Sequence, residues 1–170
     1  MREKLSNRKH TRLREYDYSQ NGYYFVTVCT EKRVKILSKI VGRGLAPAKR
    51  EYTINLTRYG KIAEQQLFDL EKRYNNIKVD YYVIMPNHIH IIIEIKETAG
   101  ASPRPTLNNV ICSYKSLTTR LINKMDNVTG RKVFQTSYYD HIIRNEQELL
   151  ETRKYIDENP IKWELDKYFL

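Results

Sequence analysis

The sequence PNHIHIIIEI at 86–95 has the alternation of a buried β-strand that carries two histidines. Side chains on a strand alternate between its two faces, so His88 and His90 point to one face while Ile89 and Ile91 point to the other. An unpaired buried polar group costs on the order of 1 to 3 kcal/mol. The pattern therefore predicts that both imidazoles have partners on their face of the sheet.

Elsewhere, hydrophobic residues recur with strand-like or helix-like spacing. The predicted strands cover 23–30, 77–85, 88–95 and 133–143, and the predicted helices cover 57–76, 106–125 and 146–159. Stretches 38–55 and 97–105 contain glycine and proline without a sustained period, which predicts two loops. The order strand, helix, strand, strand, helix, strand, helix is the split βαβ pattern. We therefore expect an α+β, ferredoxin-like (RRM-like) fold, with an antiparallel four-stranded sheet, two packing helices and an added C-terminal helix.

The length and composition favour one globular domain. The chain has 170 residues, of which 41% are hydrophobic and 29% charged, as in ordinary globular proteins. We therefore expect a single domain over 1–170, which begins with a basic arm at 1–15. No apolar run reaches the ~20 residues that a membrane-spanning helix needs, and a signal-peptide core is missing at the amino terminus. The expectation is a cytoplasmic protein without a membrane partner.

The charge favours a polyanionic partner. Lys and Arg number 30 against 20 Asp and Glu, which gives a formal net charge of +10. Such an excess attracts nucleic acid through counterion release and electrostatic steering. The basic residues that we predict to contact phosphate are Arg8, Lys9, Arg12, Arg14, Lys115, Arg120, Lys124, Arg131 and Lys132. Charged residues of this kind also serve as solubilising surface, and the sequence leaves both roles open.

The histidine pair is a candidate metal site. Two strand residues two positions apart lie roughly 6 to 7 Å apart at the backbone, so their ring nitrogens can converge on one divalent ion. A bare His-x-His pair also occurs as hydrogen-bonded core residues. The spacing alone does not choose between these readings.

The C-terminal helix contains a second set of reactive groups. Tyr155 and Asn159 are four residues apart, so they project from the same face of the helix. A phenolate can attack phosphorus to give a covalent phosphotyrosine, and an amide oxygen can ligate a cation. The structural alternative makes Tyr155 an amphipathic helix residue and Asn159 a helix terminator before Pro160.

Five stretches resemble one family. They are YDYSQNGYYFVTVCT at 16–30, VDYYVIMPNHIHIII at 79–93, SYKSLTTRLIN at 113–123, YYDHIIRNEQEL at 138–149 and YIDENPIKW at 155–163. In order and content they resemble the REP-associated tyrosine transposases, which are single-tyrosine members of the HUH endonuclease superfamily. MPNHIHIII and YIDENP are specific in combination, and together the stretches span nearly the whole chain.

The resemblance implies a function and a site. It implies His88 and His90 as ligands of Mg²⁺ or Mn²⁺, Asn159 as a third ligand, and Tyr155 as the nucleophile. The implied substrate is single-stranded DNA with a palindromic hairpin, cleaved through a 5′-phosphotyrosine, and the implied assembly is a monomer or a homodimer. His141 lies in a matching stretch, where a catalytic role and a sheet hydrogen bond are both open.

Two other functions remain open at this point. An open sheet with aromatic residues such as Tyr23, Tyr24 and Phe25 can stack bases, so a non-catalytic single-stranded nucleic-acid-binding module is the main alternative. A metal-dependent phosphoesterase that uses a water nucleophile at His88 and His90 is the other. Tyr155 would be dispensable in both.

Overall fold

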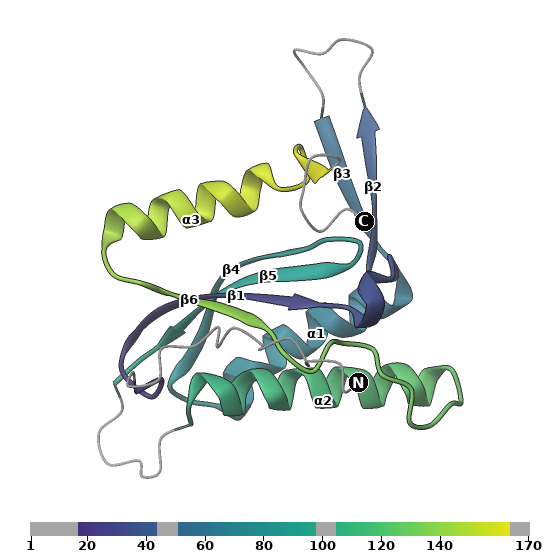
Figure 1. The fold of residues 1–170 in the computed structure, drawn as a ribbon, viewed down its shortest axis with the longest axis horizontal. Helices are drawn as coiled ribbons and strands as arrows, with labels where there is room; N and C mark the ends of the chain where they lie inside the picture. Colours follow the sequence, from purple (N-terminus) through teal and green to yellow (C-terminus); the bar gives the residue numbers. More distant parts are fainter. Residues whose placement is uncertain (1–16, 44–50, 98–104, 164–170) are drawn as a thin grey trace, which may run out of the picture.

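The computed structural model describes residues 17–43, 51–97 and 105–163. Its centre is an antiparallel sheet with the strand order β4-β5-β1-β6. The strands are β1 (Gly22–Cys29), β4 (Ile77–Ile84), β5 (His88–Ile95) and β6 (Tyr139–Ile143). Helices α1 (Arg58–Arg73) and α2 (Leu107–Met125) cover one face, and α3 (Glu146–Glu158) crosses the other (Figure 1). This confirms the predicted α+β fold, its ferredoxin-like strand order and its added C-terminal helix.

Each face of the sheet has its own hydrophobic core. Ile89, Ile91 and Ile93 of β5 belong to the larger core, which includes residues of α1 and α2. Ile92 belongs to the smaller core on the other face, together with Phe25 of β1 and Ile156 of α3. The alternation predicted for β5 is therefore confirmed, and it places His88 and His90 on the face that α3 covers.

The three predicted helices are confirmed, and each is capped at its start by a side chain. The side chains of Thr57, Thr106 and Asn145 each accept a hydrogen bond from a backbone N–H three residues later, which satisfies one donor of the first turn.

The last extended segment is shorter than expected. Only Tyr139–Ile143 of the predicted 133–143 strand joins the sheet, and Phe134 forms an isolated bridge to Thr30.

The prediction of a loop at 38–55 was wrong. Strands β2 (Ser38–Arg43) and β3 (Glu51–Leu56) form a separate antiparallel hairpin beside the C-terminal end of α3 (Figure 1). The β-branched residues pair across it, with Ile40 opposite Ile54 and Val41 opposite Thr53, and such cross-strand pairs stabilise a ladder. Ile40 and Ile54 also pack against the smaller core.

A close backbone contact fixes the base of this hairpin. A Cβ atom at Gly60, in the first turn of α1, would lie 2.0 Å from the carbonyl oxygen of Leu37, so only glycine fits there. The backbone N–H of Leu37 donates to the carbonyl of Pro86, next to the histidine strand. The short 3-10 helix η1 (Glu31–Arg33) connects β1 to this region.

Some predicted features lie outside the described residues. They are the basic arm at 1–15, with Arg8, Lys9, Arg12 and Arg14, and residues 98–104 of the loop predicted at 97–105. Among the residues that are described, no helix has the length and apolar character required to cross a membrane.

Candidate active site

The two predicted histidines face each other at the end of β5 beside the hairpin turn. Their Nε2 atoms are 3.1 Å apart, and their ring centroids are 4.5 Å apart. Both side chains are buried beneath α3 and the residues that follow it, and the Trp163 ring lies 5.8 Å from that of His88. The pair therefore forms one buried nitrogen cluster.

Hydrogen-bond contacts at the Nδ1 atoms orient both imidazole rings. The Nδ1–H of His88 donates to the Oδ1 atom of Asn87 over 2.9 Å, because a carboxamide oxygen only accepts. This leaves the His88 Nε2 lone pair directed at His90. The Nδ1 atom of His90 lies 2.9 Å from the Thr27 hydroxyl, which both donates and accepts. If the His90 Nδ1–H donates to Thr27, both Nε2 lone pairs face the same point.

Helix α3 contributes Asn159 to this point. The Asn159 amide lies 3.4 Å from the His90 Nε2 atom, and the amide oxygen is buried without a hydrogen-bond partner in the described part of the chain. A rotation of the amide exchanges its oxygen and nitrogen with almost no change in shape. Asn159 can therefore present an oxygen donor beside the two imidazoles.

Tyr155 lies one turn earlier on the same helix. Its ring packs edge-on against Phe25 and His90, with centroid distances of 5.9 and 5.3 Å. Tyr155 is 43% exposed, whereas both histidines are fully buried. Tyr155 is thus the member of the cluster that a large substrate can approach from solvent.

The donor set fits a divalent ion. Two ligands that bind one octahedral ion at neighbouring positions, with bonds of about 2.1 Å, lie about 3 Å apart. The two Nε2 atoms have this separation, and Asn159 offers an oxygen that has no hydrogen-bond partner among the described residues. Within the described ranges no three His, Cys, Asp or Glu side chains gather to hold a metal, and the Asn159 amide lies beside the two imidazoles.

Comparisons with known proteins show the family to which the chain belongs. The family model "Transposase IS200 like" matches residues 18–159. The chain belongs to this transposase family. An uncharacterized protein of Haemophilus influenzae (strain ATCC 51907 / DSM 11121 / KW20 / Rd) is 28% identical over 182 residues, covering 98% of this chain and 95% of the relative. A REP-associated tyrosine transposase solved with a REP hairpin has the same fold, with a TM-score of 0.56 and 17% identity over 89% of this chain and 73% of its own.

His141 of the transposase fastens the start of α3 to the sheet. Its Nε2 atom lies 2.6 Å from Glu148, whose other carboxylate oxygen accepts the backbone N–H of Arg144. These two contacts, the backbone hydrogen bond foremost, lower the pKa of Glu148 below its ordinary value. Glu148 lies seven residues, about two helical turns, before Tyr155 on α3, and the contact of His141 with it favours the structural role over the catalytic one.

Five of the predicted phosphate-contacting residues line a single hollow on the α2 side of the transposase. This hollow has a volume of about 770 Å³ and lies between the C-terminal half of α2 and residues 127–136. We call it the basic basin. Its basic residues are Lys115, Arg120, Lys124, Arg131 and Lys132.

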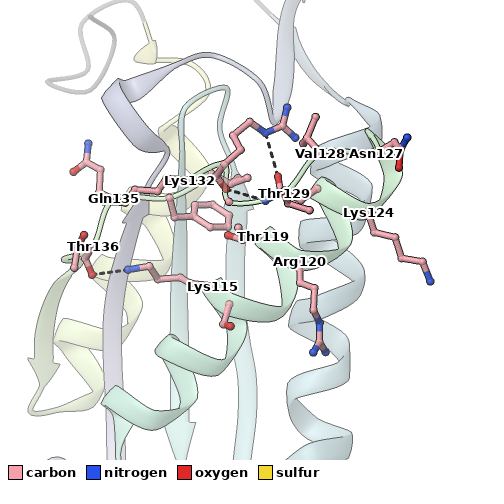
Figure 2. Close-up of a pocket in the computed structure, with 16 residues that line it drawn as sticks. Lys115, Thr119, Arg120, Lys124, Asn127, Val128, Thr129, Lys132, Gln135 and Thr136 are labelled. Atoms are coloured by element: carbon pink, nitrogen blue, oxygen red, sulfur yellow. Dashed lines mark hydrogen bonds between the residues drawn. The ribbon is translucent and has the colours of Figure 1, made fainter.

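The five cations of the basic basin differ in how they are engaged. Lys115 donates to the carbonyl oxygen of Thr136, and Arg131 pairs with Asp126 over 2.6 Å. Figure 2 shows Arg120 and Lys124 extending outward from α2, whereas Lys115 turns toward Thr136. The side chains of Arg120, Lys124 and Lys132 make no hydrogen bond or ion pair with other described residues, so these three are available to an external anion.

The sequence did not reveal three residues that shape the site of the transposase. They are Thr27 and Asn87, which orient the imidazoles, and Trp163, which covers His88. Asn87 precedes the histidines directly and could have been included with them. Thr27 becomes adjacent only through the pairing of β1 with β5, where it lies opposite His90.

Proposed function

We propose that this transposase cleaves and rejoins single-stranded DNA at hairpin sequences through a covalent 5′-phosphotyrosine on Tyr155, with Mg²⁺ or Mn²⁺ held by His88, His90 and Asn159. One observation carries the proposal. A single helix packs the Tyr155 ring against His90 and brings the Asn159 amide to the Nε2 atom of the same imidazole. Nucleophile and ligands therefore converge on one nitrogen cluster.

The protein groups around the ion have separate tasks. When bound, the ion polarises the scissile phosphate and stabilises the negative charge that develops there. Asn87 and Thr27 hold the imidazoles in the tautomers that present both Nε2 lone pairs. Imidazole nitrogens suit Mn²⁺ better than Mg²⁺, which prefers oxygen ligands, so we expect Mn²⁺ to support cleavage at lower concentration.

The bond changes balance without an external energy source. The Tyr155 phenol loses its proton to solvent, and its oxygen forms a bond to the scissile phosphorus. The bond from phosphorus to the 3′ oxygen breaks, and that oxygen leaves as a 3′-hydroxyl after taking up a proton. For rejoining, another 3′-hydroxyl attacks the phosphotyrosine, and the Tyr155 oxygen departs and is reprotonated. One phosphoester bond replaces another in each step.

The basic basin is the site at which we place the hairpin stem. The structural relative is bound to a REP hairpin, and duplex phosphates require unpaired cations such as Arg120, Lys124 and Lys132. The wall of the basin is joined to the end of β1, since Gln135 N–H donates to the carbonyl of Cys29. Cys29 lies opposite His88 in the sheet. The stem would thus bind near the end of β1, which is the end of the sheet where His88 lies.

The single strand would then cross the edge of the sheet. Tyr139, at the start of the edge strand β6, is 43% exposed, and its ring lies 6.4 Å from Phe25, which in turn contacts Tyr155. Exposed aromatic rings stack unpaired bases. A strand that leaves the basin over Tyr139 therefore arrives at Tyr155.

The experiment that tests this function compares substitutions at the nucleophile and at the metal site. Wild-type protein, Tyr155→Phe and His88→Ala are incubated with end-labelled hairpin DNA and Mn²⁺, and both binding and cleavage are measured. We expect both variants to bind the hairpin and neither to cleave it. Cleavage by Tyr155→Phe that releases a free 5′-phosphate would instead indicate a water nucleophile. Binding without cleavage by wild-type protein, across a panel of hairpins, would indicate a binding module.

A further inference from the structure

Strand β4 contains an irregularity that faces α3. Its pairing with β5 shifts between Val79, which lies opposite Ile93, and Tyr81, which lies opposite Ile92, so Asp80 is the extra residue of a β-bulge. The burial pattern shows the same shift. Ile77 and Ile84 are seven positions apart, so in a regular strand they would point to opposite faces. Both nevertheless lie in the core beneath α1 and α2.

The bulge turns two successive side chains toward α3. Asp80 receives two hydrogen bonds from Arg153, 2.8 Å from its Nε atom and 2.5 Å from its Nη2 atom. The Tyr81 hydroxyl donates to Asp157 over 2.5 Å. In a regular strand, consecutive residues would point to opposite faces. Bulges re-aim side chains in this way and often lie next to active sites.

The contacted residues lie on the flank of α3 away from the candidate nucleophile. Arg153 and Asp157 are four residues apart and share one side of the helix, whereas Tyr155 and Asn159 share another. Ile156 lies between the two flanks and is 1% exposed in the smaller core. Contacts on one flank thus fix the rotation of the helix about its axis and, with it, the direction of the other flank.

The Asp80–Arg153 contact is well suited to this task. Arginine binds a carboxylate through two parallel hydrogen bonds, which define direction as well as distance. The Asp80 side chain is 8% exposed and the Arg153 side chain 35%, so the carboxylate side of the contact is shielded from solvent. At the rim of a helix, about 5 to 6 Å from the axis, a rotation of about 15° moves an atom by about 1.5 Å. A displacement of about 1 Å from the reactive geometry can reduce a rate by about 100-fold.

We propose that Asp80 and Arg153 are positioning residues: the bulge of β4 and its ion pair to α3 set the rotation at which Tyr155 and Asn159 meet His90. Tyr81 and Asp157 provide a second, weaker contact on the same flank. The inference rests on the proposed role of Tyr155 and extends it to residues that touch neither DNA nor metal.

The test measures covalent adduct formation in a single turnover with saturating hairpin DNA and Mn²⁺, beside hairpin affinity and thermal stability. For Asp80→Asn and Arg153→Gln we expect a rate lower by about 30-fold or more, with hairpin affinity unchanged, because only the aim of Tyr155 is altered. The double variant should be no slower than the slower single variant, since both changes remove the same contact. Arg153→Lys keeps the charge without the two-point geometry and should be intermediate.

Two further variants complete the design. Tyr81→Phe removes one hydroxyl and should lower the rate less, which provides a measurement even if Asp80→Asn fails to fold. Lys154→Gln is the matched control, because Lys154 is exposed on α3 and, among the residues that the structure describes, pairs only with Glu158 of the same helix. It should retain the wild-type rate.

The outcomes separate this inference from the proposed function. Folded Asp80→Asn and Arg153→Gln proteins that form adduct at the wild-type rate would overturn the positioning role and leave the function of Tyr155 intact. A rate loss matched by equal losses of hairpin affinity and thermal stability would also overturn it, because it would indicate a general structural role. Failure of wild-type protein to form any adduct would count against the proposed function itself.

Discussion

Neutralising the unpaired cations of the basic basin should change how strongly salt weakens hairpin binding. The perturbation is the triple substitution of Arg120, Lys124 and Lys132 by glutamine. Lys115 and Arg131 are left in place because they already bind Thr136 and Asp126 within the protein. Each lost contact to a duplex phosphate lowers the slope of log affinity against log salt concentration by about 0.9.

The magnitude follows from the number of free cations. Three contacts correspond to a slope that is less steep by about 2.7. Between 50 and 200 mM salt, wild-type affinity should therefore fall about 40-fold more than that of the triple variant. Fluorescence anisotropy of a labelled DNA hairpin, measured with Tyr155→Phe as the background to prevent cleavage, gives both slopes directly.

A matched control separates the basin from net charge. Lys72 in the last turn of α1, Lys78 near the start of β4 and Lys96 just after β5 belong to the other end of the sheet, and Lys72 and Lys96 pair there with Asp69 and Glu94. Their triple substitution by glutamine removes the same charge and should change the slope little. Equal slopes for wild-type protein and the basin variant would refute the assignment of the stem to this surface, and so would an equal loss in the control.

Three further predictions concern the site itself. Thr27→Val should weaken Mn²⁺ binding, measured by calorimetry, about 10- to 100-fold, because the hydroxyl that orients His90 is lost. Thr27→Ser should retain binding. Unchanged affinity in Thr27→Val would contradict the assigned hydrogen bond. Asn159→Asp should bind Mn²⁺ at least as tightly as wild-type protein, and Asn159→Leu should bind it more weakly, since a carboxylate keeps an oxygen donor and a leucine does not. Titration of both variants with Mn²⁺ checks this. Tight binding by Asn159→Leu would remove Asn159 from the ligand set. A mixture of Tyr155→Phe and His88→Ala proteins should form no adduct, because α3 packs on the sheet of its own chain; adduct regained on mixing would show that the helix serves a partner's site.

The sequence predicted those parts of the site that depend on local periodicity. The alternation of β5 placed His88 and His90 together, and the helical spacing placed Tyr155 and Asn159 on one side of α3. Both features follow from the geometry of a single element. The helical periodicity likewise located the starts of all three helices to within one residue.

The features that the sequence did not predict arise from contacts between distant segments. In the sequence of the β2–β3 hairpin, Gly42 interrupts the strand pattern. Packing of Ile40 and Ile54 against the smaller core helps to stabilise the hairpin. The bulge at Asp80 breaks the alternation of β4, yet nothing in the local sequence marks it, because its partner Arg153 is 73 residues away. Tertiary contacts of this kind override local pattern.

The most direct test of the central claim is a search for a covalent bond between Tyr155 and DNA. Wild-type protein and Tyr155→Phe are incubated with single-stranded hairpin DNA and Mn²⁺, denatured, and analysed by gel electrophoresis and peptide mass spectrometry. The account predicts a denaturation-resistant adduct in wild-type protein only, carried by the peptide that contains Tyr155. Cleaved DNA without an adduct, or an adduct that persists in Tyr155→Phe, would contradict it.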